Sequence, residues 1–299
     1  MISLNNSSSM VEEAKKAKRK FNPFVNMLIS ILLIIAAEII TFIPIMTLSF
    51  LAAFITNGNS RVFTSDTSIY IISLFSTVSL IIICILYAKW VEVRALPSIG
   101  ITKKRFIINY SKGLLIGFLM LSALVAILVI SGQLTFYSIS FAQLPLIFLF
   151  FLGYIIQGAS EEFLCRGVLM TAISARNGVP LGILLNSLLF GLLHFFNPGF
   201  NILSFVNIVL VGILFSLYAY VNDNIIGVCA IHSMWNFAQG NIYGISVSGN
   251  ALTPSLLKVG SFKKSLLSGG SFGAEGGLIC TVVLIIAISL IVFMPKKTT

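Results

Sequence analysis

Long apolar segments restrict how this chain can fold more than any other feature. A helix needs about 20 mostly apolar residues to cross the hydrocarbon core of a bilayer. We expect a membrane span near each of eight such segments: 24–55, 69–88, 113–131, 141–160, 180–196, 202–221, 225–240 and 278–294. Charged residues make up only 9% of the chain, whereas soluble domains contain about 25%. The sequence therefore predicts an all-α polytopic membrane protein with about eight transmembrane helices.

The first apolar segment, 24–55, is longer than an upright helix requires. It also carries Glu38 and Pro44. A helix whose apolar length exceeds the bilayer thickness is accommodated by tilting. We therefore expect a tilted helix or an interfacial first turn here.

The net charge of +10 is explained by membrane topology. Basic residues cluster in three stretches, 15–20, 89–112 and 296–297. The loops expected on the opposite side hold only Arg61, Lys258, Lys263 and Lys264. With an even number of spans the three basic stretches share one side, and cytoplasmic loops are enriched in Lys and Arg. We expect a multi-pass protein of the cell membrane with both termini cytoplasmic, and no nucleic-acid partner.

Two segments outside the spans have a composition unlike the rest. Residues 1–20 are rich in Asn and Ser and then charged, which predicts a disordered, basic cytoplasmic N-terminus. Residues 21–299 are expected to form a single membrane domain. Within it, 241–277 is dense in Gly and Ser, and we expect a mobile external loop there.

Six polar residues lie inside or at the ends of the apolar segments. They are Glu161, Glu162, Arg166, His194, His232 and Asn236. The chain has only two histidines, and both are in this set. An ionised side chain at the bilayer centre costs roughly 2.5–3.5 kcal/mol even on lenient insertion scales, so such residues usually face one another or a wet cavity. This set predicts a polar intramembrane site.

The spacing of the first three residues assigns them different partners. On a helix, Glu162 and Arg166 are four residues apart and form a favourable pair. Glu161 points about 100° away from Glu162 and is suited to act as a general base on water. The alternative is an interfacial first turn, with Ser160 as cap and the two acids favoured by the helix dipole.

The other three residues allow more than one interpretation. His194 precedes a turn and could be interfacial, while His232 and Asn236 share a helix face and could stabilise helix packing. Together they could instead stabilise an oxyanion or hold a metal. The metal set would be His194, His232 and Glu161, with a divalent metal such as zinc as the possible cofactor. The residues leave the presence of a metal open.

The ordered trio Glu-Glu-x-x-x-Arg, Phe-x-x-x-His and His-x-x-x-Asn resembles the CPBP family, the CAAX proteases and bacteriocin-processing enzymes also called Abi. Here the trio is Glu161-Glu162 with Arg166, Phe190 with His194, and His232 with Asn236. The resemblance covers about residues 140–240.

This resemblance implies an eight-helix intramembrane endopeptidase, either a metalloprotease or a glutamate protease. By position, Glu161 matches the water-activating glutamate, His194, His232 and Asn236 match the other site residues, and Glu162 and Arg166 match supporting positions. The implied partner is a membrane-associated peptide or protein substrate. The alternatives are a non-catalytic bacteriocin immunity or surface-assembly scaffold protein, or a transporter that uses Glu and His relays.

Overall fold

The computed structural model describes residues 8–55, 65–102, 105–250 and 254–293. Within these ranges, five helical segments are long and apolar enough to cross a membrane: Pro23–Thr47, Asp66–Val91, Phe106–Ile130, Leu144–Asn177 and Ile202–Asn222. Two shorter apolar helices, Val179–Leu193 and Leu278–Phe293, accompany them. The protein is thus a mostly helical, multi-pass membrane protein, and the number of eight spans stays a prediction.

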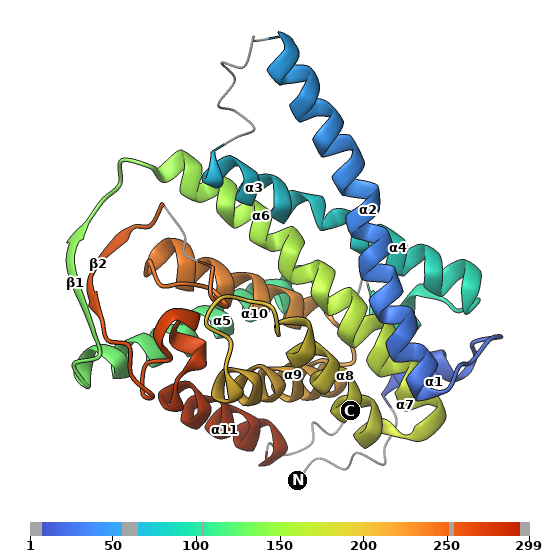
Figure 1. The fold of residues 1–299 in the computed structure, drawn as a ribbon. Helices are drawn as coiled ribbons and strands as arrows, with labels where there is room; N and C mark the ends of the chain where they lie inside the picture. Colours follow the sequence, from blue (N-terminus) through green and yellow to red (C-terminus); the bar gives the residue numbers. More distant parts are fainter. Residues whose placement is uncertain (1–7, 56–64, 103–104, 251–253, 294–299) are drawn as a thin grey trace.

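The helices follow one another closely along the chain (Figure 1). They are α1 (Ser9–Lys15), α2 (Pro23–Ile55), α3 (Asp66–Ser76), α4 (Val78–Leu86), α5 (Phe106–Ile130), α6 (Leu144–Glu162), α7 (Thr171–Asn177), α8 (Val179–Leu193), α9 (Ile202–Asn222), α10 (Ile226–Phe237) and α11 (Leu278–Phe293). Short π-helical segments extend α4 over Tyr87–Val91, α6 over Phe163–Met170 and α10 over Ala238–Ile242, and 3₁₀ turns occupy Leu96–Ile99, Gly270–Phe272 and Ala274–Gly276.

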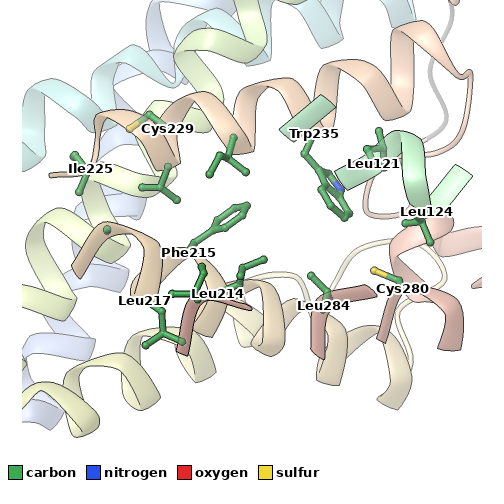
Figure 2. Close-up of a cluster of buried hydrophobic side chains, with 14 of the residues drawn as sticks. Leu121, Leu124, Leu214, Phe215, Leu217, Ile225, Cys229, Trp235, Cys280 and Leu284 are labelled. Carbon is green, nitrogen blue, oxygen red and sulfur yellow. The ribbon is translucent and has the colours of Figure 1, made fainter. Parts of the chain in front are cut away.

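Helix α10 lies at the centre of the largest apolar core. Its side chains face those of α9 and α11, and Figure 2 shows Phe215 of α9 and Trp235 of α10 pointing into the space between these helices. Glycines let two neighbouring helices approach the backbone of α10. A Cβ on Gly117 of α5 would lie 2.5 Å from the Ile231 carbonyl oxygen, and one on Gly158 of α6 would lie 2.6 Å from Ser233 Oγ. This close packing fixes α10 on both sides of His232.

Helix α2 is packed along only part of its length. Its N-terminal half joins an apolar cluster through Ala37, which is 4% exposed. Its C-terminal half extends beyond the surrounding helices (Figure 1), and its large apolar side chains there, such as Ile43, are exposed. In a membrane protein this surface faces lipid.

Two expectations about the segments outside the spans were wrong. Residues 9–15, expected to be disordered, form α1, whose Met10 and Val11 are each 1% exposed. Its N-terminus is held by Asp223 Oδ1, which accepts a hydrogen bond of 2.9 Å from the Met10 backbone N–H. Residues 1–7 lie outside the described residues, as do the basic residues Arg61 and Lys296–Lys297.

The Gly- and Ser-rich segment 241–277 was also expected to be mobile, but most of it is folded. Strand β2 (Leu257–Phe262) pairs antiparallel with β1 (Leu134–Ile139), so the protein is not purely α-helical. Nearby, Asn241 Nδ2 donates to the Pro254 carbonyl over 2.7 Å, and the Gly249 N–H donates to the Phe272 carbonyl over 2.7 Å. This segment packs against the membrane helices instead of projecting from them.

Candidate active site

Three helix ends bring the six predicted site residues together. Glu161 and Glu162 end α6, His194 follows the last residue of α8, and His232 and Asn236 lie on α10. Glu161, His194, His232 and Asn236 line one cavity of about 300 Å³. Glu162 and Arg166 are 0% exposed and lie behind it. Since the two glutamates end α6, the alternative of a Ser160-capped first turn was wrong.

Glu162 is held by two donors at one carboxylate oxygen. Its Oε1 accepts a hydrogen bond of 2.8 Å from Arg166 Nη1 and one of 2.9 Å from His232 Nδ1. The predicted pairing of Glu162 with Arg166 is confirmed. Since the carboxylate can only accept, Nδ1 of His232 carries a proton. In a neutral His232 ring, the lone pair is then on Nε2.

Arg166 connects this pair to α9. Its Nη2 donates to the Gly212 carbonyl over 3.2 Å, and its guanidinium carbon lies 4.6 Å from the centroid of the Phe190 ring and 5.4 Å from that of Phe215. A charge-assisted hydrogen bond and cation–π contacts together compensate for burial of the charge. Phe190, the first residue of the second motif, therefore packs against Arg166.

Glu161 faces the cavity side of the same histidine. Its Oε1 accepts a hydrogen bond from Gln157 Nε2, and Gln157 Oε1 accepts one of 3.1 Å from Asn236 Nδ2. Its Oε2 lies 3.7 Å from His232 Nε2 and accepts no hydrogen bond from the described part of the chain. Gln157 thus positions Glu161 through Oε1, and Oε2 is left without a hydrogen-bond donor among the described residues.

His194 enters the cavity from the end of α8. Its Nδ1 lies 2.8 Å from the Phe190 carbonyl oxygen, an acceptor, so this nitrogen carries the proton. The ring also packs edge-on against Phe190, with centroids 5.0 Å apart. These contacts fix the orientation of the ring and leave the Nε2 lone pair of neutral His194 unprotonated.

The donor set does not fit the predicted metal site. A protein zinc site typically needs three converging protein ligands in catalytic enzymes. Among the described residues, no group of three His, Cys, Asp or Glu side chains is arranged to hold a metal ion. We therefore derive no step through a metal.

The sequence analysis missed several polar residues of the cavity, among them Gln157, Glu38 and Glu275. Gln157 is four residues before Glu161, so helix periodicity could have placed it on the same face. The sequence analysis noted Glu38 only as a charged residue within the first apolar segment, 24–55. Glu275 belongs to the Gly-rich segment and carried no signal, since no local pattern connects it with α6 or α10.

Glu275 closes one wall of the cavity. Its Oε1 accepts hydrogen bonds from the backbone N–H and the hydroxyl of Ser248, and its Oε2 accepts one of 3.4 Å from Trp235 Nε1. Burial raises the pKa of the Glu275 carboxyl above its ordinary value, although the Ser248 hydrogen bonds oppose this shift. Val247, Ser248 and Asn250 line the cavity beside it, so the segment 247–250 is fixed over the site.

Comparison with known protein families gives one match, and it covers the segment that holds these residues. Residues 142–238 match the family described as Type II CAAX prenyl endopeptidase Rce1-like. The match confirms the resemblance to the CAAX protease family. The matched segment contains all six predicted residues, while Glu38 and Glu275 lie outside it. Comparisons with curated proteins and with solved structures gave no match.

Proposed function

We propose that the protein is an intramembrane endopeptidase that hydrolyses a peptide bond of a membrane-associated protein or peptide with water activated by Glu161. The observation that carries the proposal is the state of Glu161. Its Oε1 is held by Gln157, its buried Oε2 accepts no hydrogen bond from the described residues, and the Glu161 side chain lines the cavity. A general base needs such a positioned and available lone pair.

In the proposed reaction, Glu161 Oε2 accepts a proton from water as the water oxygen attacks the scissile carbonyl carbon. The Nε2 lone pair of His194 accepts the second water hydrogen and orients the attack. Asn236 donates to the oxyanion that forms on the carbonyl oxygen. The carbon–nitrogen bond then breaks and the proton on Glu161 passes to the leaving amine. The products are a carboxylic acid and an amine, and transfer of the acid proton to the amine gives a carboxylate and an ammonium group.

The buried side of the site supports this chemistry without joining it. Glu162 and Arg166 hold His232 through Nδ1, so Nε2 is directed towards Glu161. Because no group of three His, Cys, Asp or Glu side chains among the described residues is arranged to hold a metal ion, we propose the glutamate-protease rather than the metalloprotease class. From the distribution of Lys and Arg along the sequence we also propose a location in the cell membrane with both termini cytoplasmic.

The test compares the membrane and secreted peptidomes of cells that express wild type, Glu161→Gln or Glu13→Gln at matched levels. Glu13 lies on the exposed part of α1, paired with Lys16, and its amide variant controls for loss of a carboxylate elsewhere. We expect product ends that are present with wild type and Glu13→Gln and fall at least about 100-fold with Glu161→Gln, since general-base catalysis contributes about 10²–10⁴-fold.

Product ends that persist unchanged with Glu161→Gln would refute its role as base. Peptidomes that do not differ between wild type and cells lacking the protein would instead favour the non-catalytic scaffold or immunity protein. Product formation that stops with a chelator and returns with zinc would refute the metal-free assignment.

A further inference from the structure

The cavity is acidic although the chain as a whole is basic. The sequence has 19 Lys and Arg residues against 9 Asp and Glu residues. Three of those nine acids line the cavity, namely Glu38, Glu161 and Glu275, and the lining that the structure describes contains no Lys or Arg. Charges interact more strongly where water is excluded. A cavity of this composition therefore attracts a cation and repels an anion.

The three carboxylates differ in whether they are available to a ligand. Glu275 is occupied by Ser248 and Trp235, and Glu161 is the proposed base. Glu38 is an exposed residue of the apolar span Pro23–Thr47 that also lines the cavity, and its carboxylate forms no hydrogen bond or ion pair with the described residues. Ionisable residues inside spans usually face a cavity and mark the path of a substrate or ion. Glu38 is thus the carboxylate left to contact a ligand.

The hydroxyl groups of the cavity provide a second and independent sign of the ligand. Ser73, Ser76 and Thr77, at the end of α3, each donate to a carbonyl three residues earlier, over 2.7, 2.8 and 2.7 Å. A hydroxyl has one proton to donate and two lone pairs. With the proton used inside the helix, each hydroxyl can offer only an acceptor to the cavity. This part of the lining therefore matches a ligand rich in hydrogen-bond donors.

Lys and Arg side chains fit both observations. An ammonium group has three donors and a guanidinium five, and neither has an acceptor. Their long apolar stems also allow the charged end to reach a polar group from an apolar environment. Glu38 follows the buried Ala37 on α2 and precedes the exposed Ile39 and Ile40, so the cavity is bordered there by a helix with an exposed apolar surface.

We propose that Glu38 is a specificity-determining residue, and that the substrate carries a Lys or Arg side chain that binds Glu38 while the peptide bond is held at Glu161. The proposal rests on the endopeptidase function proposed above. It assigns a role to α2, which lies outside the family-matched segment 142–238. It also places a basic side chain, and not a free carboxylate, in the part of the cavity formed by α2 and α3.

The test uses the full-length protein in lipid nanodiscs and a set of apolar peptides that are identical except at one position. That position carries Lys, Arg, Gln or Glu and is moved along the peptide, and kcat and KM are measured by mass spectrometry of the products. At the preferred position we expect Lys and Arg peptides to be cleaved with a kcat/KM at least about tenfold above that of the Gln peptide, the size of one charge-assisted hydrogen bond. The difference should lie mainly in KM.

Variants of Glu38 test the residue itself. Glu38→Gln should reduce the ratio of Lys to Gln peptide cleavage to near one, Glu38→Asp should retain most of it, and Glu13→Gln should leave it at the wild-type value. Because the ratio compares two peptides on one preparation, a loss of folded protein cannot change it. Equal cleavage of Lys and Gln peptides by wild type, or a preference that survives Glu38→Gln, would overturn the proposal.

Binding separates this proposal from the endopeptidase function. Fluorescence anisotropy with the same labelled peptides is measured on Glu161→Gln and on the double variant with Glu38→Gln. Tighter binding of the Lys peptide that depends on Glu38, without cleavage by wild type, would support the cation site and refute the endopeptidase. Cleavage by wild type without any charge preference would refute the cation site and leave the endopeptidase intact.

Discussion

Glu161 and Glu162 are adjacent in the sequence but lie in two regions of very different character. The anchored side of the site consists of Glu162, Arg166 and Nδ1 of His232, all buried and joined by short hydrogen bonds. The cavity side consists of Glu161, Gln157, Asn236 and His194, where lone pairs remain available. The difference suggests that one side maintains the structure and the other performs the chemistry.

The largest effect is expected on the anchored side. Arg166→Ala would leave Glu162 buried with His232 as its remaining partner, and breaking a buried ion pair costs about 3–5 kcal/mol. We expect poor accumulation and a clearly lower melting temperature in detergent, measured by intrinsic fluorescence. Arg166→Lys keeps the charge but loses the planar group that reaches Gly212. Its melting temperature should lie between those of wild type and Arg166→Ala. If Arg166→Ala kept the wild-type melting temperature but lost cleavage, Arg166 would instead have a catalytic role.

A smaller effect on folding, but a clear one on rate, is expected for Gln157→Leu. This change removes the hydrogen bonds that position Glu161 and Asn236, and loss of positioning lowers the rate by about 10–100-fold. The melting temperature should stay within a few degrees of wild type. Gln143→Leu, at the other end of α6 where no side-chain cap is formed, is the matched control. Unchanged kcat with Gln157→Leu would contradict a positioning role.

The smallest effect is expected at the wall formed by Glu275. Glu275→Ala leaves the Ser248 N–H and Trp235 Nε1 without their acceptor, which costs about 1–3 kcal/mol for buried groups. Limited proteolysis should cut the segment 243–250 faster than in wild type. Glu275→Gln keeps one carbonyl acceptor and should protect the segment better. Equal cutting of all three proteins would show that Glu275 does not hold this segment.

The parts of the site that the sequence predicted depend on local spacing. Glu162 with Arg166, and His232 with Asn236, are each four residues apart on helices, and the structure places them as this spacing requires. The membrane-spanning character followed from apolar length alone. Where periodicity and residue type determine the outcome, the sequence was sufficient.

The parts that it did not predict depend on contacts between distant segments. Helix α1 was taken as disordered from its composition, but its fold is completed by Asp223 and by burial of Met10. Glu275 reaches the cavity only because 3₁₀ turns in a Gly-rich segment bring it beside Ser248 and Trp235. No local pattern encodes such an approach.

The single oxygen of Glu162 that accepts from both Arg166 and His232 has a consequence for biogenesis. Through these contacts it links α6, the π-helical segment after it, α9 and α10 at one point. A nascent chain in which α9 and α10 have not yet been inserted has no means of orienting His232 towards Glu161. Competence to cut would therefore arise only once the bundle is complete, so that an unfinished copy of this protein is harmless to the membrane around it.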